Sequence, residues 1–194
     1  MKEAEKEAAN DPVIIRRANE KDVSVLYNVC RQSYIQSFAD HWIEGGLTWY
    51  LEKVYGMDVL KGELKNPDII YFISYYKGEP AGFMKVKLNS PLSFQIAGSH
   101  LEIEKLYFLE QYKKKGLGKR MIDAIRELAD LLGTDLIWLA VIDTNTSAIR
   151  FYETIGFTFF DKTRLELPYF KDELRGMWRM TLEIKRKHQQ SGTR

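Results

Sequence analysis

The segment from residue 100 to residue 141, HLEIEKLYFLEQYKKKGLGKRMIDAIRELADLLGTDLIWLAV, decides the fold that the sequence predicts. Residues 100–108 favour a strand, and residues 116–132 repeat apolar side chains at the three- and four-residue spacing of an amphipathic helix. Gly133 is a typical end for that helix, and the continuously apolar residues 136–141 are typical of a strand covered on both faces. The segment therefore predicts a strand, a helix and a second strand that runs parallel to the first.

Further elements are expected on either side of this unit. Residues 69–76 and 82–88 are apolar runs on either side of Lys77-Gly78-Glu79-Pro80, which predicts an antiparallel hairpin. One domain is expected over residues 13–185, between an N-terminal tail at 1–12 and a C-terminal tail at 186–194. The additional strands are expected at 13–16, 157–160 and 178–184, and the additional helices at 23–38, 47–55, 58–64 and 147–155.

Composition and charge narrow the class of protein. The 194 residues are 45% hydrophobic, and 29 Lys and Arg against 27 Asp and Glu leave a formal charge of +2. That charge is too small to draw the whole molecule onto nucleic acid or an anionic membrane, so neither is an expected partner. The single cysteine, Cys30, lies on the apolar face of the first expected helix and is interpreted as a core residue.

The sequence carries no recognisable signal for export, membrane insertion or metal binding. There is no secretory apolar stretch near Met1 and no run of about 18 apolar residues, so a cytoplasmic protein is expected. The histidines are dispersed and no Cys-x-x-Cys pair is present, so no metal site is expected.

Residues 113–119, KKKGLGK, stand between the first strand and the helix of the deciding segment. Backbone N–H groups at a helix N-terminus bind anions, and Gly116 and Gly118 let the backbone approach a phosphate without an intervening Cβ. A P-loop would need glycine at position 113 and a dinucleotide fingerprint a third glycine at position 121, where the chain has Lys113 and Met121. The motif indicates a phosphate site, although these residues alone equally allow a solvated basic turn. Its positive charge comes from Lys113, Lys114, Lys115 and Lys119.

A second motif, N-x-x-A-x-x-F-Y-E-x-x-G-F, follows over residues 145–157. A K-x-x-G-x-G loop after a strand and this second motif, in this order and spacing, resemble the GCN5-related N-acetyltransferase (GNAT) superfamily. Within the family, the strand LEIEKLY at residues 101–107 is most similar to bacterial spermidine/spermine acetyltransferases of the PaiA type. The family usually has Gln or Arg where this chain has Lys113, which keeps the charge and loses the planar fork.

The resemblance implies an α/β (α+β) fold around a mixed, mostly antiparallel, twisted sheet of about six or seven strands, flanked by about four helices. Its central parallel pair would be splayed apart, with acetyl-coenzyme A in the gap and no metal. The pyrophosphate would rest on residues 113–119, and the pantetheine arm on the strand edge at 106–108 and on Asn145. The cofactor-binding residues implied in this way are Leu106, Tyr107, Phe108, Lys113, Lys114, Lys115, Gly116, Leu117, Gly118, Lys119, Asn145, Ala148, Phe151 and Tyr152.

The reaction that the resemblance implies is attack of a neutral amine on the thioester of acetyl-coenzyme A. An alkylamine has a solution pKa of about 10, so a general base must take its proton. Glu102 and Glu104 differ by two positions in a strand and should project from one face, and Glu104 is narrowly the preferred base. By the resemblance, Tyr152 lies beside the sulfur and protonates the departing thiolate. From the residues alone, the glutamates could equally be ordinary exposed strand residues, one of them paired with Lys105 or an arginine. From the residues alone, Tyr152 is more simply a core aromatic.

The acceptor is expected to be the primary amine of a small molecule, and a polyamine is the preferred candidate. Aromatic faces with carboxylates suit a polycation, although the same aromatics could simply pack between two helices and the sheet. Two other functions stay open, a non-catalytic sensor of acetyl-coenzyme A and an acetyltransferase of a protein or peptide amine, as does a homodimer through the last strands. The residues expected on the acceptor side are Tyr34, Phe38, Trp42, Trp49 and Tyr50, with the acids Asp40, Glu44 and Glu52.

Overall fold

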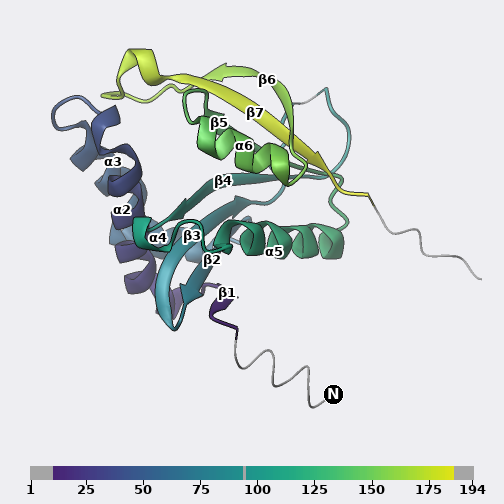
Figure 1. Cartoon of the computed structure of the whole chain (residues 1–194), viewed down its shortest axis with the longest axis horizontal. Coiled ribbons are helices and arrows are strands. Elements are labelled where there is room, and N and C mark those ends of the chain that lie inside the picture. The colour runs from purple at the N-terminus through teal and green to yellow at the C-terminus, as the bar shows by residue number, and fades with distance from the viewer. Residues whose placement is uncertain (1–10, 94, 186–194) are drawn as a thin grey trace, which may run out of the picture.

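A seven-stranded sheet runs through the centre of the molecule (Figure 1), in a computed structural model that describes residues 11–93 and 95–185. The strands lie in the order β1-β2-β3-β4-β5-β7-β6, and within the described residues β4 and β5 are the one parallel pair. This mixed sheet confirms the predicted fold class. The strand bounds are β1 Val13–Arg17, β2 Ile69–Tyr76, β3 Glu79–Lys87, β4 His100–Phe108, β5 Leu136–Ile142, β6 Thr158–Arg164 and β7 Gly176–Glu183.

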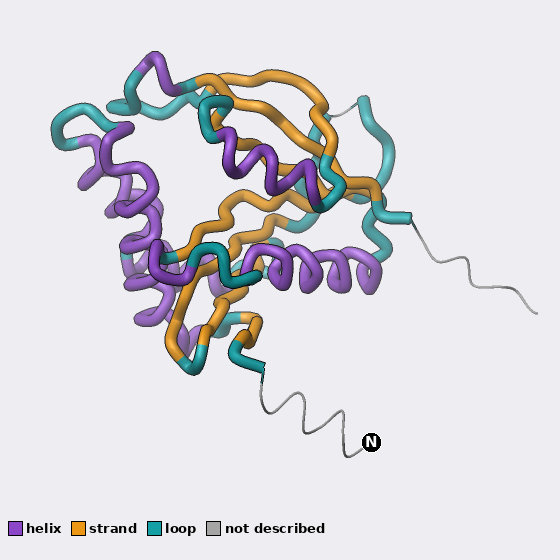
Figure 2. Tube along the Cα trace, viewed as in Figure 1, coloured by secondary structure: helices purple, strands orange, loops and turns teal. Residues whose placement is uncertain are grey.

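Helices cover both faces of the sheet (Figure 2), and each face has its own apolar core. Ile73 and Phe83 pack into the core with the first group of helices, whereas Met84 and Val86 pack into the core with the second group. This alternation follows from the two-residue period of a strand. The first group is α2 Val23–Phe38, α3 Gly46–Tyr55 and α4 Met57–Lys65, and the second is α5 Leu117–Leu132 and α6 Thr146–Thr154.

The predicted elements occur with small shifts at their ends. Asn19 caps a short 3-10 helix, Glu20–Asp22, through a reciprocal capping box, and α2 follows directly. β6 runs to Arg164 instead of ending at residue 160, because it continues to pair with β7 although its residues are mostly exposed. As an edge strand it leaves Phe159 and Phe160 47% and 40% exposed, so these two rings are not core residues.

β4 and β5 share a short stretch of pairing, from His100 with Leu136 to Ile103 with Leu139. Past this last pair, residues 104–108 of β4 continue beside β3, and residues 140–142 of β5 continue beside β7. The two parallel strands therefore separate toward their C-terminal ends. This is the splayed central pair that the family resemblance implies, and the structure confirms it.

The loop between β6 and β7 contacts the loop between α2 and α3. Trp42 forms an isolated antiparallel bridge with Phe170, and the centroids of their rings lie 5.0 Å apart. The backbone N–H of Ile43 donates a hydrogen bond to the carbonyl oxygen of Tyr169 at 3.0 Å. This contact joins the strands on one side of the splayed pair to the helices that cover the other side.

The expected tails at 1–12 and 186–194 lie outside the described residues, apart from Asp11 and Pro12. Lys77 N–H donates to the carbonyl oxygen of Pro12 at 2.6 Å, and the Asp11 carboxylate forms an ion pair with Arg120. Asp11 and Pro12 therefore both contact the folded part of the chain. None of the helices in the described part of the chain combines the length and apolar character needed to cross a membrane.

Candidate active site

A β-bulge in β4 positions the preferred catalytic base. Lys105 pairs with Lys85 of β3 and Ile103 pairs with Val86, so Glu104 is an extra residue between the two pairs. The bulge changes the phase of the strand, so that Glu104 and Lys105 both face the α2–α4 side. The apolar residues of β4 that pack on the other side are Leu101 and Ile103 before the bulge and Leu106 and Phe108 after it.

Three ammonium groups surround the Glu104 carboxylate. Its Oε2 atom lies 2.9 Å from Lys85 Nζ and 3.1 Å from Lys87 Nζ, and its Oε1 atom lies 3.1 Å from Lys105 Nζ. Burial by itself would raise the pKa of Glu104, but the three ammonium groups, led by Lys105, outweigh burial and lower that pKa to about 2. The carboxylate is therefore ionised throughout the neutral range.

Glu102 projects to the same face as Glu104, as the sequence predicts. Lys87 Nζ lies 3.8 Å from Glu102 Oε2 and so stands between the two carboxylates. Ser90 Oγ donates a hydrogen bond to Glu102 Oε2 at 2.8 Å. With side chains 16% and 19% exposed, neither glutamate is freely solvated. The ion pair between Glu104 and Lys105 is the pairing that the alternative interpretation includes.

Tyr152 lies on α6, across the opening from β4. Its ring is buried and packs 5.3 Å from Phe151 and 5.6 Å from Phe157, measured between ring centroids. Burial raises the pKa of the Tyr152 hydroxyl. Burial also raises the pKa of Tyr107 on β4. Tyr152 is thus a core aromatic of α6, as the alternative interpretation describes.

The loop that precedes α5 has the backbone shape of an anion site. Lys114 and Gly116 both have positive φ values, 61° and 79°, and no side chain caps the N-terminus of α5. The first amides of an α-helix have no partner within the helix, so these N–H groups remain directed at the loop. Lys113 and Lys119 are exposed and balanced by Glu110 at 2.5 Å and Asp123 at 2.8 Å. Because these two lysines are paired with carboxylates, the uncapped N–H groups of α5 are an important part of the attraction that this loop offers to an anion.

The first turn of α5 lies against α6. A Cβ atom built on Gly118 would stand 2.8 Å from Cζ of Phe151, closer than packed atoms allow. Asn145 caps α6, because its Oδ1 atom accepts a hydrogen bond from the backbone N–H of Ala148 at 3.2 Å. The structure thus brings the 113–119 loop and the start of the second motif together, as the two predicted halves of one site require.

We expect Gly118→Ala to weaken coenzyme binding, because the added methyl group must push the first turn of α5 away from Phe151. The expected loss in affinity is about tenfold, which corresponds to overpacking by about 1–2 kcal/mol. Isothermal titration calorimetry with coenzyme A measures it. The matched control is Gly62→Ala, since Gly62 lies in α4 with nothing within 4 Å of an added Cβ. Equal affinities for the two variants and the unaltered chain would contradict this account of the loop.

The aromatic residues expected on the acceptor side form one packed cluster. The rings of Tyr34 and Tyr50 stack with centroids 4.6 Å apart, and Trp42 lies 4.8 Å from Tyr50. Phe38 contacts Tyr34 at 5.0 Å, and all four rings are buried in the core beneath α2 and α3. These residues pack against one another, in agreement with the alternative interpretation of them. The cluster borders the opening through Tyr107, whose ring lies 5.3 Å from Phe38.

The remaining acceptor candidates lie nearer the surface. Trp49 contacts Tyr169 of the β6–β7 loop at 5.5 Å. Asp40 and Glu44 are exposed on the segment between α2 and α3. Glu52 is also exposed, and its carboxylate is paired with Arg31 at 2.9 Å. The acids therefore sit at the rim of the α2–α3 region, outside the aromatic cluster.

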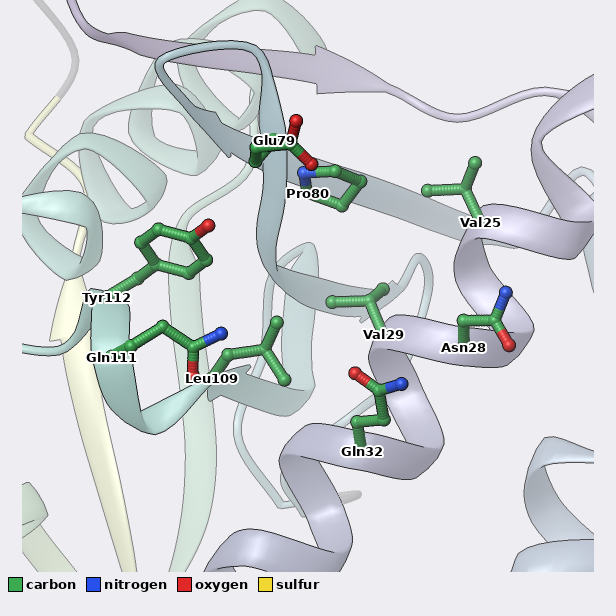
Figure 3. Close-up of a pocket in the computed structure, with 9 residues that line it drawn as sticks. All are labelled: Val25, Asn28, Val29, Gln32, Glu79, Pro80, Leu109, Gln111 and Tyr112. Atoms are coloured by element: carbon green, nitrogen blue, oxygen red, sulfur yellow. The ribbon is translucent and has the colours of Figure 1, made fainter.

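Two surface pockets lie near these elements. The first has a volume of about 290 Å³ and separates α2 from the β2–β3 turn and residues 109–112, with Asn28, Gln32 and Tyr112 in its wall (Figure 3). The second, of about 330 Å³, is lined by residues 66–69 and 87–91. Lys87 belongs to the wall of the second pocket and also contacts both candidate glutamates, so this pocket is the one that adjoins them.

The other chemically reactive groups lie in the core. Cys30 is a free, fully buried cysteine, as predicted, and burial raises the pKa of its thiol well above the ordinary range. His100 is buried, and its Nδ1 atom accepts a hydrogen bond from the backbone N–H of Leu92 at 3.1 Å. In the residues that the structure describes, no group of three or more His, Cys, Asp or Glu side chains is placed to hold a metal ion.

Sequence reasoning missed Lys85 and Lys87, two of the three lysines that contact Glu104. Lys85 is 3% exposed, although lysine is a residue normally left in solvent. A signal was present in β3, where Lys85 and Lys87 alternate with the apolar Met84 and Val86. That pattern indicates a polar face, but it does not reveal that α4 covers this face.

A family model described as Acetyltransferase (GNAT) family matches residues 31–157. An uncharacterized N-acetyltransferase of Lactobacillus delbrueckii subsp. lactis is 27% identical over 150 residues, which are 77% of this chain and 87% of that protein. A spermine/spermidine N(1)-acetyltransferase of Bacillus subtilis (strain 168) is 34% identical over 86 residues, 44% of this chain and 57% of that protein.

A solved structure shares the fold. The crystal structure of the PaiA N-acetyltransferase from Thermoplasma acidophilum, in complex with coenzyme A, matches with a TM-score of 0.70 and 21% sequence identity. The match covers 88% of this chain and 98% of that chain. The shared architecture therefore extends over nearly the whole of both molecules.

Proposed function

Because this chain belongs to the GNAT family of acetyltransferases, we propose that it transfers the acetyl group of acetyl-coenzyme A to a primary amine of a small molecule. Both substrates would be bound together, and the amine would attack the thioester carbon directly. The C–N bond forms as the C–S bond breaks, the amine loses a proton and the thiolate of coenzyme A gains one. The enzyme therefore needs an anion site for the coenzyme, a proton acceptor and a proton donor.

The observation that carries this proposal is the position of the uncapped end of α5 at the mouth of the splayed strands. β4 leaves β5 after Ile103, ends at Phe108 and is followed by the 113–116 loop, so the loop lies at the open end of the gap. A ligand with a pyrophosphate and an extended amide-containing arm suits this arrangement. Its anion would meet the α5 amides, and its arm would pair with the free edge of residues 106–108. Acetyl-coenzyme A has both parts.

Two side chains at the gap fit the proton transfers. Tyr152 would donate a proton to the leaving thiolate, since its raised pKa keeps the hydroxyl protonated at working pH. Glu104 would accept the proton of the amine, and its carboxylate is held in place by Lys85 and Lys87 at Oε2 and by Lys105 at Oε1. A backbone N–H of β4 near Leu106 would stabilise the negative charge that develops on the carbonyl oxygen.

The low pKa of Glu104 limits how it can act as a base. At a pKa of about 2 the carboxylate is fully ionised but only weakly basic, so it cannot remove a proton from a free alkylammonium ion of pKa about 10. It can accept the proton that the amine loses as it bonds to carbon, directly or through one water. Glu102, which has one ammonium neighbour at 3.8 Å, is the second candidate for the same role.

Among acceptors, we propose a polyamine. The Bacillus subtilis relative is named for spermine and spermidine, and it matches 44% of this chain. The exposed acids Asp40 and Glu44 at the α2–α3 rim can attract a second or third ammonium group of such a substrate. The packed aromatic cluster would then form the wall of the acceptor side and would not enclose the polycation.

An acceptor screen tests the proposed function. We expect purified protein with acetyl-coenzyme A to release free thiol when spermidine is added, and not when fully N-acetylated spermidine is added as the matched control. An aminoglycoside and a peptide with a free N-terminus complete the panel, because they represent other amine classes. Binding of acetyl-coenzyme A by calorimetry with no thiol release for any amine would show a sensor instead of an enzyme. Release with the peptide alone would move the acceptor to a protein amine.

A further inference from the structure

A buried chain of polar contacts runs from α4 to the bulge in β4. Lys85 Nζ lies 2.5 Å from Glu63 Oε1 on one side and 2.9 Å from Glu104 Oε2 on the other. The hydroxyl of Tyr71 on β2 donates a hydrogen bond to the second oxygen of Glu63. Four elements, α4, β2, β3 and β4, are thereby connected through one lysine that is 3% exposed.

Stability alone does not account for this arrangement. Removing charged groups from water costs about as much as their attraction returns, so well-packed apolar side chains would often serve the fold equally well. Glu63, Lys85 and Glu104 each have an oppositely charged partner, and the chain of contacts ends on the carboxylate that we propose as the base. From this we infer that Glu63 and Lys85 are positioning residues, which fix the place of the Glu104 carboxylate at the bulge.

The bulge explains why Glu104 needs such support. As the extra residue of β4, Glu104 has no directly opposed residue on β3 to restrict its side chain. Lys85 and Lys87 reach Oε2 from the neighbouring strand, whereas Oε1 has Lys105 as its ammonium partner. Lys85 differs from Lys87 because its own position is fixed by Glu63, while Lys87 is 39% exposed. The Glu63–Lys85 pair is thus the rigid part of the support.

The charged groups around Glu104 determine whether its pKa rises or falls when one of them is removed. Lys85, Lys87 and Lys105 lower its pKa. Without Lys85, the effect of burial would be opposed by fewer ammonium groups, and the pKa of Glu104 would rise from about 2 toward the ordinary value. Without Glu63, Lys85 would remain and the pKa would not rise. The other titratable groups on the elements packed around this carboxylate are Glu102, Tyr107, Tyr50 on α3, Tyr71 on β2 and Cys30 on α2.

This inference rests on the proposed function, and the test uses Lys85→Met, Lys85→Gln, Lys85→Arg and Glu63→Gln in the full chain. For Lys85→Met and Lys85→Gln we expect kcat to fall about 10- to 100-fold with KM for acetyl-coenzyme A unchanged, because a displaced base costs rate and not coenzyme binding. Lys85→Arg should recover most of the rate, since it keeps the charge. Lys61→Met is the matched control, because Lys61 lies on α4, is 54% exposed and pairs with the exposed Asp58.

The pH dependence separates positioning from a merely structural role. We expect kcat/KM of Lys85→Gln, divided by kcat/KM of the unaltered chain, to decrease at pH values under 5. Titration of the acceptor amine affects both proteins equally and therefore cancels in this ratio. Glu63→Gln should lower kcat with a ratio that stays flat. A ¹³C NMR titration of the Glu104 carboxyl group measures the rise in its pKa without any activity. An unchanged Glu104 titration and unchanged kcat in folded Lys85→Gln would overturn the inference. If the unaltered chain releases no thiol with any amine, the proposed function fails instead.

Discussion

Tyr152→Phe is expected to lower kcat about 10²- to 10⁴-fold while binding of coenzyme A stays intact, which is the range for loss of a general acid. The reason is that a thiolate leaves carbon poorly unless it gains a proton, and the hydroxyl of Tyr152, a buried residue of α6, is the donor that we propose. Phenylalanine keeps the contacts with Phe151 and Phe157, so the fold and the coenzyme site should be undisturbed. The measurement is kcat by thiol release, with calorimetry for coenzyme affinity.

The control for this substitution is Tyr27→Phe, which removes one hydroxyl from a partly buried ring of α2. It should leave kcat within about twofold, because a surface substitution away from the site changes stability and geometry little. The proton-donor role is wrong if Tyr152→Phe turns over at the normal rate across the pH range while coenzyme binding is preserved.

Glu104→Gln is expected to lower the free energy of unfolding at pH 7 by about 3–5 kcal/mol, in addition to its effect on the proposed proton transfer. The substitution leaves Lys85 and Lys105 with buried ammonium groups, 4% and 10% exposed, and removes the carboxylate that both of them contact. A loss of this size is a large fraction of the free energy of unfolding of a typical domain, which is about 5–15 kcal/mol. Urea unfolding followed by circular dichroism measures the change.

The matched control for this change is Glu102→Gln. Glu102 has one ammonium neighbour at 3.8 Å and one hydrogen bond from Ser90, so the expected loss is about 1 kcal/mol. A loss for Glu104→Gln no larger than that for Glu102→Gln would contradict the strength assigned to the three-lysine cluster.

The difference between the unaltered chain and Glu104→Gln should also depend on pH. The folded pKa of Glu104, about 2, lies below the value of 4.5 for an unperturbed glutamate, so its ionised form favours the folded state. That contribution is complete above pH 4.5 and is lost as the pH falls from 4.5 toward 2. Unfolding experiments at pH 7 and pH 3 should therefore show a smaller difference between the two proteins at pH 3.

Much of the fold follows from local patterns in the sequence. α5 could be predicted because its apolar residues repeat at helical spacing, and β5 because it is continuously apolar. Gly133 has the positive φ of 66° that ends α5. The loop before α5 was predicted from its two glycines and its lysines. The aromatic segment between α2 and β2 was divided correctly into two helices, because Gly56 separates α3 from α4.

The bulge in β4 was not predicted, although the sequence contains its trace. The apolar positions of the strand are odd at Leu101 and Ile103 and even at Leu106 and Phe108, a change of phase that one inserted residue produces. Between them, Glu104 and Lys105 are both polar, so no single residue identifies the insertion. The buried lysines escaped prediction for a different reason. Alternation in β3 shows that Lys85 shares a face with Lys87, but only the tertiary structure shows Glu63 of α4 above that face.

The short pairing between β4 and β5 divides the sheet into two half-sheets. One of them carries the proposed proton acceptor, and the other is associated with the proposed proton donor. Glu104 belongs to the β1–β4 half, and Tyr152, on α6, follows the half that contains β5, β7 and β6. The halves meet at the four-residue seam, and they are also joined where Trp42 bridges to Phe170 and where Gly118 of α5 lies against Phe151 of α6. The separation between the proposed proton acceptor and the proposed proton donor therefore depends on how these joints hold the half-sheets relative to each other, and we expect a substitution at Trp42 to lower turnover without altering either group.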